Sequence, residues 1–252
     1  MKLFFVFALI LLTTVAKAQL AVINDPDGFV NVRDGKSSNS KIVGKLYNNE
    51  AFLFDGESEN DQWINVFFEG KNLLNYNSSA NNAERVYVTG YIHKSRLISI
   101  ESLPHIKLNK SNHLPTLNSS TVKNDSISLS IKTGAFKIKA HKITRSNGGC
   151  LNCAKLFVDK IDGKKPWGVD GDLPKIEITE MRLTINNSIV EIPVSSINDL
   201  YQPTIKNLNI YFGKKGTLYI YMPGNSDGAG GYDVVWIINN GKLLCRYIDS
   251  ID

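Results

Sequence analysis

The most constraining feature of the sequence is an alternation of apolar and polar side chains with a period of two residues. It is clearest near the C-terminus, where four short runs are separated by Gly- and Asn-rich turns. A period of two places successive side chains on opposite faces of a strand, whereas a helix repeats every 3.6 residues. The runs therefore predict an antiparallel meander with one buried face. They span 208–212, 218–222, 232–238 and 243–247.

Two predicted hairpins precede this meander. Each consists of two alternating runs joined by residues that favour a tight turn. One short helix or turn is also expected at 195–201. We therefore expect 126–252 to form an antiparallel-β domain with little helix. The hairpins comprise 126–132 with 136–141, joined at Thr133-Gly134, and 181–185 with 189–192, joined at Asn186-Asn187.

The first 18 residues have the pattern of a secretory signal peptide. Lys2 gives a positive start, the run 3–15 is apolar, and Ala16-Lys17-Ala18 ends with small residues in the Ala-x-Ala pattern. The apolar run is shorter than the roughly 20 residues that a spanning helix needs. We predict cleavage after Ala18, a secreted or periplasmic protein, and no stable membrane span after cleavage.

Length and composition limit the class of protein. The 252 residues are 42% hydrophobic and include only 3 Cys, which excludes a disordered chain and a disulfide-dense miniprotein and favours two domains. The net charge of +5 falls to +3 without Lys2 and Lys17, so no nucleic-acid partner is expected. Residues 101–165 hold 12 basic and 4 acidic side chains. That excess either meets anionic wall polymers or lipid head groups, or forms a solvated face.

The segment 19–100 also contains short β-like runs at close spacing and no helical period. This pattern predicts a small barrel or sandwich. The runs are 29–33, 41–46, 51–54, 63–67 and 86–92.

These runs resemble a bacterial SH3 (SH3b) domain from Leu20 to Ile100. The stretch 28–46, GFVNVRDGKSSNSKIVGKL, resembles the opening of the family, Trp63-Ile64-Asn65-Val66 resembles its central tryptophan strand, and 90–97 resembles its final strand. Lys36 stands where the family usually has a proline, and 69–85 is an Asn-rich insertion. Such a loop either lies near a ligand surface or is a tolerated excursion.

The resemblance implies an SH3-like small barrel that binds rather than catalyses. Its expected partner is a cell-wall peptide or glycan, or another envelope protein. Arg33 would pair with a peptide carboxylate, and Trp63 and Tyr91 would stack on a sugar or peptide face. The alternative is a purely structural role for each residue. The candidate contact residues are Asn31, Arg33, Asp34, Trp63 and Tyr91.

The next segment, 101–125, contains no Phe, Tyr or Trp and is rich in Ser, Asn and Lys. This composition predicts an interdomain linker.

The three cysteines allow several interpretations. Cys150 and Cys153 form a Cys-x-x-Cys pair that would serve as a redox dithiol or as half of a zinc site completed by His141 and Cys245. The third interpretation is a disulfide between Cys245 and one of the pair, which leaves one cysteine over. The disulfide is the favoured interpretation, and no metal site or cofactor is predicted.

Two further features are candidate binding elements. The Gly-rich run 223–231 would hold calcium through Asn225 and Asp227 or approach a ligand closely, or it is simply a long hairpin turn. Tyr219 and Tyr221 should share the face opposite Ile220, either as an exposed binding pair or beneath another element.

No catalytic motif is present in the sequence. The histidines at 93, 105, 113 and 141 all precede Cys150, and neither His-Glu-x-x-His nor Gly-x-Ser-x-Gly occurs. We predict an exported, non-enzymatic binding or scaffolding protein of the cell envelope. A cell-wall hydrolase remains an alternative if Asp170, Asp172, Asp227 and Asp233 converge. An inhibitor or immunity-type protein is another, with 223–231 inserted into a target.

Overall fold

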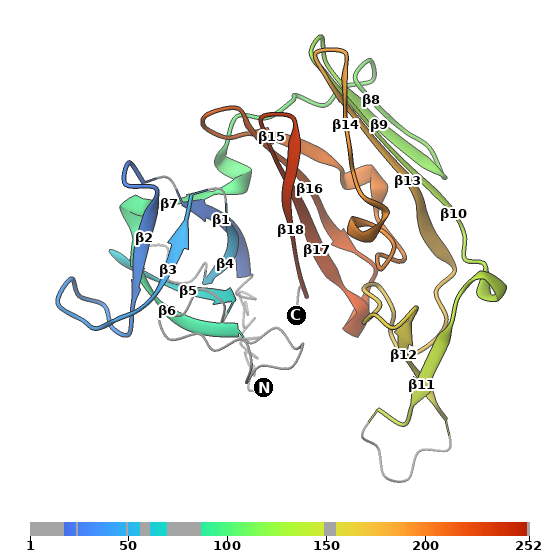
Figure 1. Ribbon diagram of the computed structural model, residues 1–252, viewed down its shortest axis with the longest axis horizontal. Coiled ribbons are helices and arrows are strands. Elements are labelled where there is room, and N and C mark those ends of the chain that lie inside the picture. The colour runs from blue at the N-terminus through green and yellow to red at the C-terminus, as the bar shows by residue number, and fades with distance from the viewer. Residues whose placement is uncertain are drawn as a thin grey trace, which may run out of the picture.

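The structure, a computed structural model, describes residues 18–23, 25–48, 50–55, 61–69, 87–148 and 155–250. The predicted signal peptide up to residue 17, the insertion 69–85 apart from its first residue, and the Cys-x-x-Cys pair lie outside the described residues. Within them the chain is mainly β, with antiparallel sheets joined by short 3-10 turns, which confirms the predicted fold class. Three sheets lie side by side in Figure 1, with the C-terminal strands in the middle.

The first sheet has seven strands in the order β3-β2-β6-β5-β4-β1-β7. The five strands predicted in this region are all present. The predicted closed barrel is not, because β3 and β7 are edge strands of the described sheet. Two strands without a sequence prediction, β1 and β7, extend the sheet beyond β4. The strands are β1 (Ala18–Ile23), β2 (Phe29–Arg33), β3 (Ile42–Tyr47), β4 (Ala51–Asp55), β5 (Trp63–Glu69), β6 (Tyr87–His93) and β7 (Leu97–Ser99).

This sheet curves around its own apolar core. Alternate residues of β5 are buried, and the residues between them are half-buried. The 3-10 turns η3 (Lys94–Arg96) and η4 (Ile100–Ser102) flank β7. Buried side chains of the core include Val32, Leu46, Phe52, Ile64, Phe68 and Ile92.

The second half of the chain forms a sandwich of two antiparallel sheets. One sheet has the order β14-β13-β10-β9-β8 and the other is the meander β15-β16-β17-β18, as predicted. The five-stranded sheet contains β8 (His113–Pro115), β9 (Ser119–Lys123), β10 (Ile127–Ala135), β13 (Ile176–Ile185) and β14 (Ser188–Val190). The four-stranded sheet contains β15 (Asn209–Phe212), β16 (Thr217–Asn225), β17 (Tyr232–Asn239) and β18 (Lys242–Ser250).

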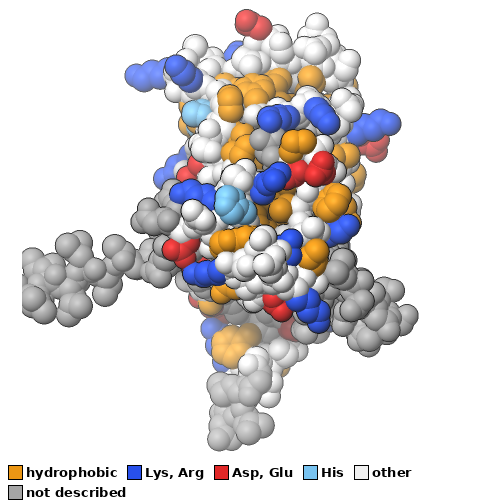
Figure 2. Space-filling view, turned by 90° about the vertical axis from the view of Figure 1, so that its left-hand side faces the viewer, with side chains coloured by type: hydrophobic (Ala, Val, Ile, Leu, Met, Phe, Trp, Pro, Cys, Tyr) orange, Lys and Arg blue, Asp and Glu red, His pale blue; other side chains and the backbone are white. Residues whose placement is uncertain are grey.

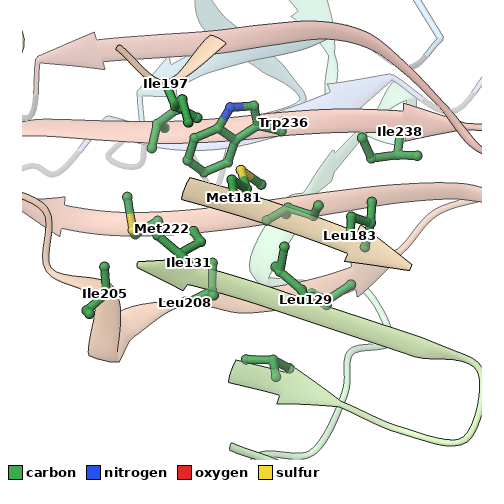
Figure 3. Packing of buried hydrophobic residues seen from close by; sticks show 14 of the residues in the cluster. Leu129, Ile131, Met181, Leu183, Ile197, Ile205, Leu208, Met222, Trp236 and Ile238 are labelled. Carbon is green, nitrogen blue, oxygen red and sulfur yellow. The ribbon is translucent and has the colours of Figure 1, made fainter. Parts of the chain in front are cut away.

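The core of the sandwich lies between these two sheets. Trp236 is completely buried there, and its indole Nε1 donates to Ser196 O at 3.0 Å. Ser196 belongs to η6 (Val194–Ser196), the short turn found within the segment where a helix or turn was expected. Figure 3 shows the facing side chains, among them Leu129, Ile131, Met181, Leu183, Met222, Trp236 and Ile238.

The four-stranded sheet is buried on its second face as well, although the meander was predicted with one buried face and a cover over Tyr219 and Tyr221 was one of two alternatives. Val235 and Ile237 of β17 and Tyr219 of β16 pack against the first sheet. Leu20 and Ile100 are among the residues that they meet. The meander is therefore the middle of three layers and not a sheet with a single buried face.

The predicted linker 101–125 is also wrong. This segment includes β8 and β9, and Ile106 and Val122 within it enter the sandwich core. Ile106 N donates to Ile210 O at 3.0 Å, so the segment also covers the edge of β15. The core contacts of Ile106 and Val122 and the pairing of β8 with β9 place this stretch in the sandwich, although its composition suggested a linker.

The hairpin predicted at Thr133-Gly134 does not form. Instead, β10 continues through Gly134, which pairs with Glu177 of β13, and the strand shifts register between Lys132 and Thr133. The predicted second run becomes the 3-10 turn η5 (Ile138–Ala140). The hairpin of β13 and β14 is confirmed, with Asn186 and Asn187 at φ of 48° and 64°.

A two-stranded ribbon completes the structure. It consists of β11 (Ile143–Ser146) and β12 (Phe157–Ile161) and extends away from the sheets at the lower right of Figure 1. The remaining 3-10 turns are η7 (Ile205–Asn207) and η8 (Gly228–Gly230).

Candidate functional site

Three of the residues predicted to contact a ligand lie on one face of the first sheet. Arg33 of β2 pairs with Tyr91 of β6, and Tyr91 pairs in turn with Asn65 of β5. Trp63 pairs with His93 one step further along the same two strands. All five side chains are half-buried and alternate with buried residues, so they share the outer face. We call Arg33, Lys36, Trp63, Asn65, Tyr91 and His93 the outer-face patch.

A glycine allows the strands of this patch to approach closely. A Cβ atom on Gly90 would lie 2.4 Å from Val32 Cγ1 and 3.0 Å from Arg33 O. Any larger residue would therefore force β6 away from β2 at the Arg33–Tyr91 pair. Gly90 precedes Tyr91 in the stretch that resembles the final SH3b strand.

Two aromatic rings meet at one end of the patch. The Trp63 and His93 rings are 5.6 Å apart and nearly perpendicular, at 88°. His93 Nδ1 accepts a hydrogen bond from Ser95 N at 3.3 Å and so caps η3. Its Nδ1 also lies 2.8 Å from Ser95 Oγ, so Ser95 holds the imidazole beside the Trp63 ring.

A lysine from the β2–β3 loop covers the other aromatic ring. Lys36 Nζ lies 5.8 Å from the centre of the Tyr91 ring and 2.6 Å from Asp61 Oδ2. The hydrogen bond to Asp61 raises the pKa of Lys36 above its usual value. Lys36, at the position where the resembled SH3b sequences usually have a proline, thus adds a cation paired with Asp61 to this surface.

The other predicted residues of this region surround the patch. Arg33 Nη1 donates to Ser40 O at 2.7 Å, which closes the β2–β3 loop. A guanidinium has five N–H donors, so this bond uses only part of its capacity to donate hydrogen bonds. Asp34 is exposed at the start of that loop, and Asn31 is half-buried opposite Lys45 of β3. Figure 2 views the molecule from the side of the first sheet. Hydrophobic side chains are interleaved there with Lys and Arg.

Sequence reasoning did not assign His93, Lys36, Asn65 or Asp61 to a site. Strand alternation could have identified His93 and Asn65, because each lies two residues from a predicted contact residue on the same strand. The Lys36–Asp61 pair joins two loops and has no sequence signal.

The tyrosine pair of the C-terminal domain is not a binding surface. Tyr219 and Tyr221 are only 2% and 5% exposed, because the first sheet covers them. Burial raises the pKa of Tyr219 to about 12. Tyr221 donates to Asp233 Oδ2 at 2.5 Å, and burial together with this carboxylate raises its pKa strongly.

The Gly-rich loop 223–231 is anchored to its surroundings. Asn225 is fully buried, and its Oδ1 accepts from Thr204 N at 2.9 Å while its Nδ2 donates to Met222 O at 2.6 Å. Ser226 Oγ donates to Gly168 O at 3.2 Å. Asn225 thus uses its amide to hold the loop, and only Asp227 of the predicted calcium pair is exposed.

Two of the four aspartates proposed for a hydrolase have different partners. Asp172 pairs with Lys155 at 2.8 Å, which lowers the pKa of the carboxyl, and Asp233 accepts from Tyr221 and from Gly224 N. Asp170 Oδ2 lies beside the Gly-rich loop, 3.1 Å from where a Gly228 Cβ would stand.

A second polar cluster connects the ribbon to the five-stranded sheet. His141 hydrogen-bonds through Nδ1 to Asp162 Oδ2 at 2.7 Å and through Nε2 to Glu177 Oε2 at 2.8 Å. Phe136 stacks on the ring at 4.7 Å between centres. Burial lowers the pKa of His141, but the two carboxylates outweigh it and raise the pKa overall. Both nitrogens donate only in the charged ring, so this geometry fits an imidazolium.

One of the three cysteines lies in the described part of the chain. Cys245 is an exposed residue of β18, and Cys150 and Cys153 lie outside the described residues. Both ring nitrogens of His141, which would complete the predicted half zinc site, contact the carboxylates of Asp162 and Glu177. In the described part of the chain, no group of three or more His, Cys, Asp or Glu side chains could hold a metal ion.

Comparison with known proteins adds no relative. No family model, no curated protein and no solved structure matches the chain. The resemblance to bacterial SH3 domains therefore stays a prediction. A search of the described ranges for a helix long and apolar enough to cross a membrane also found none.

Proposed function

We propose that the chain is an exported binding protein of the cell envelope and that the outer-face patch binds a cell-wall peptide or glycan. One observation carries the proposal. The outer face of the first sheet is divided into a covered half, formed by β1, β4 and β7, and an accessible half that presents Trp63, Tyr91 and Arg33. Aromatic faces beside fixed cations suit a ligand that has sugar or peptide planes and carboxylates.

The second half of the chain serves in this proposal as the support of the binding sheet. It covers the apolar residues of β1 and β4 and leaves β2, β5 and β6 accessible. A rigid sheet holds binding side chains more accurately than a loop. The role is therefore binding, with the sandwich as a scaffold.

Sedimentation of the whole mature chain with isolated peptidoglycan tests the proposal. We expect the protein to sediment with the polymer, and Trp63→Ala and Tyr91→Ala each to weaken retention by about tenfold or more, as for aromatic hot spots. Tyr47→Ala is the matched control, because Tyr47 is an exposed tyrosine of the same sheet outside the patch. Thermal unfolding verifies that each variant is folded.

The ligand class follows from competition. Soluble wall peptides and glycan stripped of its peptides are added separately, and the competitor that releases the protein identifies the part recognised. The proposal fails if the folded wild type does not sediment, or if the patch variants bind as well as Tyr47→Ala.

A further inference from the structure

The ribbon and its flanking segments concentrate positive charge on a different part of the molecule. Residues 136–148 and 155–175 hold nine Lys or Arg and four Asp. All nine cations are exposed. Without this segment and the predicted signal peptide, the chain has 18 basic and 20 acidic residues. The molecule is thus polarised, with a cationic extension on a slightly acidic body. The cations are Lys137, Lys139, Lys142, Arg145, Lys155, Lys160, Lys164, Lys165 and Lys175.

Two of the four aspartates are already engaged inside the segment. Asp162 accepts from His141 and from Lys142 N at 2.8 Å. Asp172 pairs with Lys155 at 2.8 Å. These pairs leave most of the lysines to face an external partner, and that partner must be anionic.

Apolar side chains lie exposed among these cations. Ile138, on η5 between Lys137 and Lys139, is 49% exposed, and Leu156, next to Lys155, is 51% exposed. Lys165 Nζ lies 4.8 Å from the centre of the half-buried Trp167 ring. A hydrated polyanion would gain nothing from Ile138 or Leu156. The head-group region of a bilayer accepts both kinds of side chain, because lysines meet phosphates while apolar groups reach the acyl boundary.

We propose that the ribbon segment, residues 136–148 and 155–175, is a docking surface for an anionic lipid bilayer. The surface is separate from the outer-face patch, since the two lie on opposite sides of the middle sheet (Figure 1). Membrane contact through the ribbon would therefore leave β2, β5 and β6, the strands that carry the patch, outside the contact.

Co-sedimentation with lipid vesicles tests the proposal on the mature chain from Gln19, which lacks the apolar run of the predicted signal. Vesicles of phosphatidylcholine with phosphatidylglycerol are compared with phosphatidylcholine alone, at low and high salt. We expect binding to the anionic vesicles only, and weaker binding at high salt.

Matched variants locate the contact. Lys137→Gln, Lys139→Gln and Lys160→Gln combined should weaken binding by at least about tenfold, from the contribution of each lysine near an anionic surface. Lys107→Gln, Lys110→Gln and Lys123→Gln combined change the net charge equally at the far end of the sandwich, and should have a much smaller effect. Ile138→Ser should weaken binding several-fold, whereas Ile189→Ser, at an 86% exposed site on β14, should not.

Three outcomes would overturn the proposal. Equal losses in the two lysine triples would mean that net charge alone drives binding. Binding to neutral vesicles as strong as to anionic ones would remove the role of the cations. Full competition by dextran sulfate, with no effect of Ile138→Ser, would instead identify a surface for a soluble polyanion.

Discussion

Strands β10 and β16 are both nine residues long and face the same core, yet their second faces differ. In β10, Ser128 and Lys132 are exposed, whereas Ile127, Leu129 and Ile131 are buried. In β16, every residue from Thr217 to Met222 is buried. Solvent covers the second face of β10, whereas the first sheet covers that of β16.

The difference shows that a period of two defines the faces of a strand but does not reveal what covers them. The alternate positions of β16 are tyrosines, which combine a large apolar ring with one polar group. Two tyrosines of this interface bond to carboxylates: Tyr221 of β16 donates to Asp233 Oδ2 at 2.5 Å, and Tyr247 of β18 donates to Asp249 Oδ2 at 2.8 Å. The serine and lysine side chains on the second face of β10 are polar throughout or charged, so that face must stay in contact with water.

The largest expected loss of stability comes from substitutions in the core that β10 and β16 share. Trp236→Ala should lower the free energy of unfolding by about 3–5 kcal/mol, and Leu129→Ala by about 2–5 kcal/mol, because each leaves a cavity in the common core. Both residues are completely buried. Urea denaturation measures the loss. A large loss in only one of the two would show that the sheets do not share one core.

The next loss of stability compares a substitution on the covered second face of the middle sheet with one on the solvent-facing side of β10. Ile237→Ala, on the second face of the middle sheet, should cost about 2–5 kcal/mol because Ile237 is completely buried against the first sheet. Ser130→Ala, on the second face of β10, should change stability by less than about 0.5 kcal/mol. Similar small values for both variants in urea denaturation would contradict the three-layer arrangement.

The cluster around His141 gives an intermediate effect that depends on pH. His141→Gln should cost about 1–3 kcal/mol at mildly acidic pH, since it removes two charge-assisted hydrogen bonds between the ribbon and β13. Stability is measured as a function of pH for the wild type and the variant. Identical profiles would show that His141 is not charged in the folded protein.

The direction of the pH dependence follows from the pKa shifts. The folded-state pKa of His141 is raised, so its contribution is complete below the unfolded value near 6.5 and is lost as pH rises through the folded pKa. The pKa of Asp162 is lowered, so its contribution is present above its unfolded value and is lost as pH falls through the folded pKa. The contact should therefore be strongest in mildly acidic solution.

The smallest effect belongs to the exposed face of the five-stranded sheet. Glu180 Oε1 lies 2.6 Å from Arg182 Nε and 3.4 Å from Lys132 Nζ, and both cations are largely exposed. Glu180→Gln should change stability by less than about 1 kcal/mol, and the change should shrink at high salt. A loss above this range in thermal unfolding would indicate that this face is covered in solution.

Local sequence signals predicted much of the fold. Five of the seven strands of the first sheet, the β13–β14 hairpin and the C-terminal meander all follow from alternation and turn residues. Alternation also placed Arg33, Trp63 and Tyr91 in strands that become neighbours. Glycine at 134 suggested a turn, but the pairing of β10 with β13 continued the strand through it.

The missed features depend on contacts between distant residues. His141 meets Asp162 and Glu177, which lie 21 and 36 positions away, and no local pattern encodes that meeting. The order in 101–125 depends on Ile106 and Val122 reaching a core built mainly by later strands. The covered face of β16 requires knowledge of where the first sheet packs.

The apolar interface between the first sheet and the middle sheet means that the chain is not modular. Leu20 and Ile100 share a core with Tyr219 and Ile237, so a cut near residue 100 would leave two fragments, each with a face that is dry in the intact chain. Such faces promote aggregation. Denaturation should give one cooperative transition rather than two. The segment 19–100 therefore cannot be transplanted onto another protein without the surface that covers it.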